Sequence, residues 1–239
     1  MKVPFLDLKA QYNSIKEEVN PAIQNILDNT AFILGKSVSE FETNFAKALD
    51  VKSCSAVSSG TTNDEKLGAK FKMMREHGSS QKYHHEMYGH NYRMEGIQGA
   101  VLNVKLKHLN DWTNERRRVA KKYKECLKGV DQIILPFEMD YAKHVYHLFV
   151  IQVKSKDKAD RSATRNELQK FLEDNGVSTG LHYPIPLHVQ PCFKSLGYKK
   201  GDFPVAEELA ERGLSLPVYP ELADNMIEYV SEKIKEFFK

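Results

Sequence analysis

The stretch S53-C-S-A-V-S-S-G-T61 is followed directly by T62-N-D-E-K-L-G-A-K-F-K-M-M-R75. The first part predicts a short strand that enters a Ser-Ser-Gly-Thr turn, and the second part predicts a helix. Backbone N–H groups and a threonine hydroxyl at a strand-to-helix turn form a nest that suits an anion. We therefore expect Gly60 and Thr61 to contact a phosphate group.

The helix after this turn has the signals of a helix start. Thr62 or Asn63 can cap it through a side-chain oxygen, and Asp64 and Glu65 suit the positive end of the helix dipole. Its apolar face is predicted to consist of Leu67, Phe71 and Met74.

Two amphipathic helices are expected before the turn. The first covers residues 13 to 29 and contains Pro21, which would kink it because proline lacks an amide hydrogen. The apolar residues of the first helix are Ile15, Val19, Ile23, Ile26 and Leu27, and those of the second are Val38, Phe41, Phe45 and Leu49.

The second half of the chain predicts a long helix and then an α+β region. The helix extends from about 94 to 127, with a break near Asn110. A strand is expected at 145–153, and Thr164–Glu167 has the pattern of a capping box that opens a helix. A second short strand is expected at 177–181, a third strand or its loop at 214–217, and a last helix at about 223–238.

Composition excludes several classes of protein. The chain has 239 residues, of which 41% are hydrophobic and 28% charged, so it predicts one large or two small globular domains. Lys plus Arg number 35 against 32 Asp plus Glu, and this balance argues against a nucleic-acid partner. The sequence shows no membrane span or signal layout, and we expect a cytoplasmic protein with reduced cysteines.

A metal site is not indicated by the histidine-rich segment K82-Y-H-H-E-M-Y-G-H90. A helical zinc motif needs two residues between its Glu and its second His, whereas three separate Glu86 from His90. We assign no metal ligand. The signatures G-x-S-x-G, Walker A and G-x-G-x-x-G are also absent from the sequence, so hydrolase, P-loop and Rossmann functions lack their core residues.

Several motifs together resemble one enzyme family. They are V3-P-F-L-D-L-K-A-Q-Y12, the Ser-Ser-Gly-Thr turn, R75-E-H-G78, K82-Y-H-H85, G89-H-N-Y-R93 and H182-Y-P-I-P-L-H188. In this order they resemble the DegT/DnrJ/StrS family of pyridoxal-phosphate-dependent (PLP-dependent) sugar aminotransferases. The junction at Thr61-Thr62 joins parts that are distant in that family.

The resemblance implies an α/β fold of the aspartate-aminotransferase-like type, fold type I, with most of the large-domain sheet deleted. Residues 1–61 correspond to the N-terminal part of the large domain and 62–110 to helices from its end. Residues 111–239 correspond to the small C-terminal α+β domain. The missing middle would carry the lysine that forms the Schiff base with PLP and the Asp that pairs with the pyridine nitrogen, so no catalytic residue is assigned.

The resemblance also implies binding roles. Asn91 takes the place of an asparagine that reaches across a dimer interface to the cofactor phosphate of the neighbouring subunit, beside Gly60 and Thr61. A second interpretation is that Asn91 and Arg93 only fix a loop through local hydrogen bonds. His182 and Tyr183 are implied to contact the nucleotide-sugar near its diphosphate, although a proline-rich loop also has a purely structural interpretation.

Family membership implies transfer of an amino group from glutamate to a nucleotide-linked keto-sugar, in polysaccharide or deoxyaminosugar biosynthesis. Because the lysine segment is missing, we expect this chain to be inactive alone. Two alternatives stay open at this point: a homodimeric or mixed-dimer binding partner of an intact paralogue, and the product of a disrupted gene.

Overall fold

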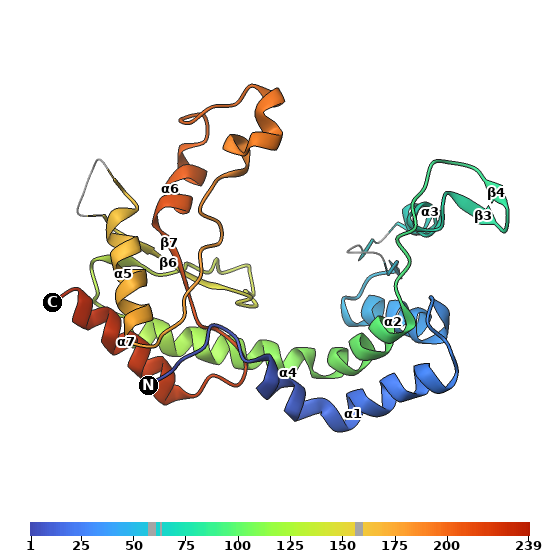
Figure 1. Ribbon diagram of the computed structural model, residues 1–239, viewed down its shortest axis with the longest axis horizontal. Helices are drawn as coiled ribbons and strands as arrows, with labels where there is room; N and C mark the ends of the chain where they lie inside the picture. The colour runs from blue at the N-terminus through green and yellow to red at the C-terminus, as the bar shows by residue number, and fades with distance from the viewer. Residues whose placement is uncertain (57–60, 63, 156–159) are drawn as a thin grey trace. The chain divides into compact units, whose positions relative to one another are not determined.

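The computed structural model describes residues 1–56, 61–62, 64–155 and 160–239, and these form two compact units (Figure 1). The N-terminal unit is Gln11–Asn110, and the C-terminal unit combines Met1–Ala10 with Asp111–Lys239. The three-part division at 61 and 110 stays a prediction. The helices are α1 (Leu8–Asp28), α2 (Gly35–Ala48), α3 (Glu65–Arg75), α4 (Gly96–Cys126), α5 (Ala163–Asp174), α6 (Pro204–Arg212) and α7 (Asp224–Phe237), with 3-10 helices η1 (Leu187–Val189) and η2 (Pro191–Leu196).

All of the named strands are short and pair in antiparallel fashion. Two sheets have two strands each, and a third has the order β5-β6-β7. The strands are β1 (Ser53–Cys54), β2 (Thr61–Thr62), β3 (Ser79–Gln81), β4 (His84–His85), β5 (Ile133–Ile134), β6 (Phe149–Val153) and β7 (Gly213–Leu216). Among the described residues there is thus no parallel sheet of the size that the family's large domain would need.

In the N-terminal unit, α1, α2 and the first half of α4 supply most of the buried apolar residues. Gly99 of α4 allows close packing on α2, since an added Cβ would lie 3.0 Å from the Val38 backbone. Glu18 of α1 accepts hydrogen bonds from the Lys107 ammonium at 3.2 Å and the His108 ring at 2.7 Å. The apolar core residues of this unit are Ile15, Val19, Ile26, Val38, Ala46, Cys54, Ala56, Ala100 and Val104.

Three sequence predictions for helices of this region need correction. Helix α1 begins at Leu8 because the Asp7 carboxylate accepts a hydrogen bond from the Ala10 amide at 2.8 Å. Helix α3 is capped by Asp64, not by Thr62, which lies in β2; Asn63 is outside the described residues. Helix α4 has no break at Asn110, because no glycine or proline occurs between residues 100 and 126 and the low propensity of Asn costs only tenths of a kcal/mol.

The predicted apolar face of α3 is also wrong in part. Leu67 is 40% exposed, whereas Gly68 and Arg75 are the buried residues of this helix. Asp64 accepts hydrogen bonds from the Lys66 and Leu67 amides at 2.8 and 3.1 Å, so its carboxylate satisfies two of the free donors at the helix start. The cap of α3 is therefore one or two residues later than the predicted Asn63 or Thr62.

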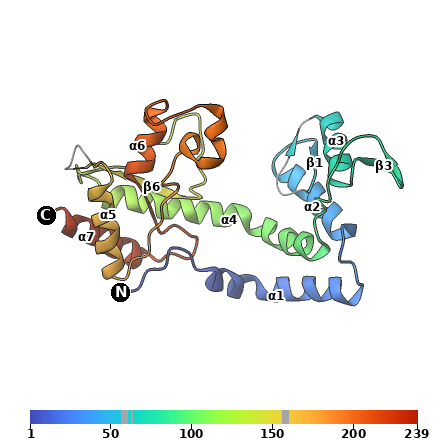
Figure 2. The same cartoon turned by 45° about the horizontal axis from the view of Figure 1, so that its top comes forward.

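The C-terminal unit has its core between a three-stranded sheet and helices α4, α5 and α7 (Figure 2). Strand β6 alternates, so that Phe149, Ile151 and Val153 are fully buried while Val150 and Gln152 are half-buried. Val3 belongs to this core and pairs through its backbone with Val177. The strand predicted at 145–153 is present as β6 over Phe149–Val153 only, and the helix predicted at 223–238 is confirmed by α7.

Two predictions in the C-terminal unit are wrong. Thr164 does not open a capping box, because Ser162 precedes the first turn of α5 and Thr164 is buried inside that turn. Residues 177–181 form no strand, because Val177 pairs with Val3 and Gly180 pairs with Ser215, so the segment is shared between two partners. The predicted strand at 214–217 is present as β7.

The loop before β6 is held by one carboxylate. Glu138 accepts hydrogen bonds from the Arg117 guanidinium at 2.8 Å, the His144 amide at 2.8 Å and the Tyr146 hydroxyl at 2.8 Å. These donors, with Arg117 the largest contributor, lower the pKa of Glu138 from 4.5 to about 2. The ionised form is therefore favoured in the folded state.

Acid should weaken the C-terminal unit through Glu138. A carboxyl group with a depressed folded-state pKa contributes stability above its ordinary value of 4.5 and loses it as the pH falls toward about 2. We expect Glu138→Gln to be less stable than the wild type at neutral pH but to lose less stability in this window. Urea midpoints followed by the fluorescence of Trp112 measure the difference, with Glu173→Gln as the exposed control. Equal acid sensitivity of Glu138→Gln and the wild type would contradict the assignment.

Candidate functional site

The motifs R75-E-H-G78 and G89-H-N-Y-R93 are joined at the C-terminus of α3. The last carbonyl groups of a helix have no partner inside it, and here they accept hydrogen bonds from the later motif. The His90 amide donates to the Met74 carbonyl at 2.7 Å, and the Tyr92 amide donates to the Arg75 carbonyl at 3.0 Å. The segment that carries Asn91 is therefore positioned by the helix that follows the junction.

Two glycines make this contact possible. A Cβ on Gly78 would lie 1.6 Å from the Met87 carbonyl oxygen, and a Cβ on Gly89 would lie 2.0 Å from the Gly78 nitrogen. Gly78 also has a φ of +77°, which other residues rarely adopt. The glycines of both motifs are thus required by a close approach of two backbone segments.

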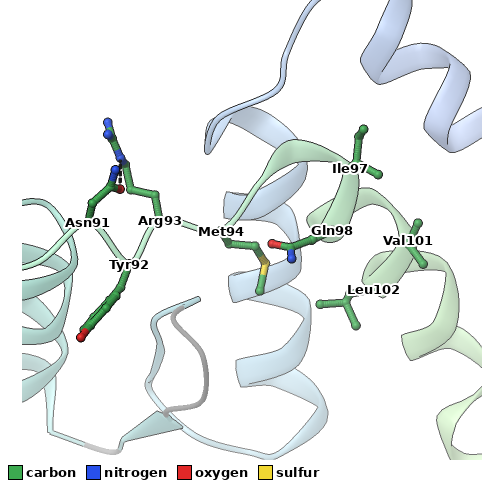
Figure 3. A pocket seen from close by; sticks show the side chains of 8 residues that line it. All are labelled: Asn91, Tyr92, Arg93, Met94, Ile97, Gln98, Val101 and Leu102. Carbon is green, nitrogen blue, oxygen red and sulfur yellow. Dashed lines mark hydrogen bonds between the residues drawn. The ribbon is translucent and has the colours of Figure 1, made fainter.

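Asn91 and Arg93 form a local pair. The Arg93 Nε donates to the Asn91 Oδ1 at 2.9 Å, and both side chains are exposed on the side opposite to Tyr92 (Figure 3). This contact is the local hydrogen bond of the structural interpretation. It uses the carbonyl oxygen of the Asn91 amide and leaves the amide nitrogen available as a donor.

A pocket of about 650 Å³ lies beside this pair (Figure 3). Its wall continues from the extended segment into the first turns of α4, where the Gln98 side chain accepts a hydrogen bond from the Glu95 amide at 3.1 Å. None of the described residues that line it is a lysine or a carboxylate. The lining residues are Asn91, Tyr92, Arg93, Met94, Ile97, Gln98, Val101 and Leu102.

The turn that was predicted to bind a phosphate is only partly described. Gly60 lies outside the described residues, and of Thr61 the structure gives the backbone, which pairs with Cys54 in the β1–β2 ladder. The contacts of Gly60 and Thr61 with an anion therefore stay predictions.

A buried ion pair fixes the strand that leads to this turn. The Arg75 guanidinium donates to the Glu42 Oε1 at 2.5 Å and to the Ala56 carbonyl at 3.2 Å. Glu42 also accepts from the Ala56 amide at 2.7 Å. Since Arg75 lies after the junction and Glu42 and Ala56 lie before it, this network joins the two parts of the chain inside one folded unit.

The His182 ring is held by a hydrogen bond and by a stacking contact. Its Nδ1 lies 2.9 Å from the Ser215 Oγ of β7, and its ring stacks on Phe5 at 5.6 Å between centroids. Tyr183 is 75% exposed. The two residues border a pocket of about 720 Å³ that is lined mainly by apolar side chains, among them Pro184, Ile185, Pro186, Leu187, Ala206, Leu209 and Ala210.

The described residues that line this second pocket include no lysine or arginine. A diphosphate carries several negative charges and is usually matched by cations or backbone donors. The predicted placement of His182 and Tyr183 near a diphosphate is therefore not supported by their surroundings and stays a prediction. The pocket instead offers an apolar wall with His182, Tyr183 and Gln190 as its polar groups.

The predicted site residues lie in two different units. Asn91 belongs to the N-terminal unit, whereas His182 and Tyr183 belong to the C-terminal unit. Sequence reasoning did not single out Gln98, which lines the first pocket, or Ser215 and Phe5, which contact His182. For Gln98 the spacing of three residues after Glu95 was a usable capping signal, but Ser215 is 33 residues from His182 and carried no local signal.

No group of three His, Cys, Asp or Glu side chains in the described parts of the chain is placed to hold a metal ion. Within the same residues, no helix is both long and apolar enough to cross a bilayer. All three cysteines, Cys54, Cys126 and Cys192, are free thiols, and burial raises the pKa of the Cys54 thiol.

Comparison with known proteins identifies the family. The profile of the DegT/DnrJ/EryC1/StrS aminotransferase family matches residues 13–63 and again 61–235. The chain belongs to this family. The two matched stretches meet at residues 61–63, which is where the sequence analysis places the junction.

Individual relatives agree with this assignment. The chain is 43% identical to a pleiotropic regulatory protein of Geobacillus stearothermophilus over 180 residues, covering 74% of this chain and 46% of that protein. It is 35% identical to a dTDP-3-amino-3,4,6-trideoxy-alpha-D-glucose transaminase of Streptomyces venezuelae over 176 residues, covering 74% and 44%. The chain thus spans about half the length of the curated relatives that it matches.

The fold agrees as well. The crystal structure of S. venezuelae DesV in complex with a ketimine intermediate superposes with a TM-score of 0.89 at 21% identity, covering 99% of this chain and 98% of that chain. The predicted fold class, a reduced form of the fold type I aminotransferase architecture, is confirmed.

The described residues do not fit PLP as a covalently held cofactor. PLP in this family needs a lysine for its aldehyde carbon and a carboxylate for its pyridine nitrogen. The family match breaks at residues 61–63, where the missing middle would supply both groups. The pocket beside Asn91, a residue that in the family serves a neighbouring subunit, is lined by neither group among the described residues. No catalytic step through PLP is therefore assigned to this chain.

Proposed function

We propose that this chain derives from a PLP-dependent nucleotide-sugar aminotransferase and does not transfer amino groups by itself. The ancestral reaction would move an amino group from glutamate to a keto-sugar carried by a nucleotide. The names of the relatives support this reaction class, since one is a transaminase of a dTDP-linked sugar. The observation that carries the loss of activity is the break of the family match at residues 61–63, together with the span of only about half the length of the curated relatives.

Binding roles follow from the retained motifs. The Asn91 amide nitrogen and the Arg93 guanidinium are exposed donors that suit a phosphate oxygen. His182 and Tyr183 would contact the nucleotide-sugar from the pocket that they border. The apolar wall of this pocket suits the sugar or base ring of the ligand better than its diphosphate. We include Gly60 and Thr61 as phosphate contacts on the strength of their position in the family motif.

A dimer in the cytoplasm is part of the same proposal. In the family, an asparagine at the position of Asn91 serves a neighbouring subunit, and Asn91 is exposed here. The free cysteines accord with a reducing compartment. Co-purification with an intact paralogue in a fixed ratio would be the mark of a mixed dimer, whereas a homodimer would form from this chain alone.

The purified full chain, supplied with PLP, glutamate and the keto-sugar substrate of the S. venezuelae transaminase, should release no 2-oxoglutarate above the enzyme-free blank. That transaminase serves as the positive control in the same assay. A second readout is independent of turnover: after borohydride reduction, intact-mass measurement should find no phosphopyridoxyl group on this chain. Turnover above the blank, or a stoichiometric adduct on one lysine, would contradict the proposal.

A further inference from the structure

The C-terminal unit has another cavity, separate from the His182 pocket, whose lining is mainly cationic. It has a volume of about 450 Å³ and lies between α4 and the loop that contains Glu138. Its described lining has four cationic side chains and one carboxylate, with an amide and a phenol as the other polar groups. The lining residues are Asn114, Arg117, Arg118, Lys121, Lys124, Glu138 and Tyr146.

The cations share one face of α4 because of their spacing. Residues three and four apart on a helix are neighbours, so Lys121 has Arg117, Arg118 and Lys124 as its nearest cationic neighbours. Like charges at these spacings destabilise a helix. Glu125 lies one turn further along α4 but does not line the cavity.

Two of the four cations are already neutralised. Arg117 binds Glu138, as described above. Arg118 binds Glu115 at 2.7 Å and also contacts Asp224. The carboxylate of Glu138 is therefore committed to Arg117 and its other donors, and it is poorly placed to neutralise a further cation.

Lys121 and Lys124 keep uncompensated charge. Lys121 is exposed, and the structure shows no acceptor for its ammonium group among the described residues. Lys124 donates to the Tyr146 hydroxyl at 2.8 Å, which is a neutral acceptor.

We propose that this cavity binds an oligophosphate anion, with the Lys121 and Lys124 ammonium groups as its main ligands and the Asn114 amide as a further donor. The volume corresponds to about fifteen water molecules, which is enough for a diphosphate group. Lysine suits this role because its ammonium is a point charge with three donors that can follow a flexible phosphate chain. The inference is independent of the proposed function, since the cavity shares no residue with the Asn91 pocket or the His182 pocket.

Inorganic diphosphate is the probe for the first experiment, and calorimetric titration of the full chain should show saturable binding that weakens as salt is added. Lys121→Ala should weaken binding about tenfold, the scale of one charge-assisted hydrogen bond. The double variant with Lys124→Ala should weaken it further. Lys121 is exposed, so the single variant should keep the far-ultraviolet circular dichroism spectrum of the wild type.

Lys128→Ala is the matched control, because Lys128 is an exposed lysine just after the end of α4 and does not line the cavity. It removes the same charge and should leave the affinity within about twofold. Tighter binding of UDP than of diphosphate would support a nucleotide as the source of the phosphates, and equal or weaker binding would support a free oligophosphate. Absence of saturable binding at millimolar diphosphate, or equal losses in Lys121→Ala and Lys128→Ala, would overturn the proposal.

Discussion

Replacing Arg75 with alanine should lower the free energy of unfolding of the N-terminal unit by about 3 to 5 kcal/mol, because it leaves the buried Glu42 carboxylate with only the half-exposed Lys72 ammonium nearby. The side chains of Arg75 and Glu42 are only 8% and 10% exposed, and their closest atoms are 2.5 Å apart. Arg75→Ala would also remove the hydrogen bond that the Arg75 guanidinium donates to the Ala56 carbonyl. Both parts of the chain that meet at the junction depend on this pair.

Cys54 provides the readout for this effect. It is buried in the N-terminal unit, two residues before Ala56, whereas Cys126 and Cys192 lie in the C-terminal unit. Labelling with a thiol reagent, followed by peptide mass analysis, measures how often Cys54 becomes exposed. Arg75→Ala should accelerate labelling of Cys54 by about a hundredfold or more, which is the opening expected from a loss of this size.

Lys72→Ala is the control for Arg75→Ala. Lys72 lies on the same helix and approaches Glu42 to 3.8 Å, but its side chain is 50% exposed. An exposed ion pair contributes at most about 1 kcal/mol, so this variant should change Cys54 labelling little. Similar labelling rates in the two variants would mean that the buried pair does not stabilise the unit.

Sequence patterns predicted the elements whose burial depends on local periodicity. Strand β6 was found from its β-branched and aromatic residues, and it does alternate between buried and half-buried positions. The last helix was expected at 223–238, and in α7 the apolar residues Ile227, Val230 and Ile234 are buried at helical spacing. In both cases one face of the element meets a core, so the pattern of apolar residues contains the needed information.

Elements whose boundaries depend on distant partners were predicted less well. Residues 177–181 looked like a strand, but Val177 pairs with Val3, and that partner lies at the other end of the sequence. The start of α3 was missed because Thr62, Asn63 and Asp64 are all good capping residues. Thr62 is excluded as the cap only by its pairing in β2, and Asp64 is the cap in the structure. Local propensity could not choose between these alternatives.

The candidate site shows the same division. The G-x-N-x-R motif located Asn91, and the structure adds that its backbone is held by the C-terminus of α3. The Glu42–Arg75 pair was not predicted, because its members are 33 residues apart and on opposite sides of the junction. A buried arginine cannot be distinguished from an exposed one on an amphipathic helix until its partner is known.

Phe149→Ala should destabilise the C-terminal unit by about 3 to 5 kcal/mol, since it removes a large side chain from a closed core and leaves a cavity. Phe149 is fully buried in β6, and its ring lies 5.1 Å from that of Tyr123 and 6.1 Å from that of Tyr146. The Tyr146 hydroxyl in turn donates to Glu138. The void left by Phe149→Ala would therefore also loosen the loop that borders the cavity lined by Lys121 and Lys124. The unfolding of this unit can be followed by the fluorescence of Trp112, the one tryptophan of the chain.

Phe137→Ala makes the same chemical change at a side chain that is 81% exposed and should alter stability by less than about 0.5 kcal/mol. Phe149→Leu, which keeps part of the volume, should fall between the two alanine variants. A Phe149→Ala midpoint close to that of Phe137→Ala would show that the sheet and α4 do not share one core. We expect Phe149→Ala to be the least stable of the three variants and Phe137→Ala the most stable. This order would indicate that the rings of α4, β6 and the loop before β6 pack as one core.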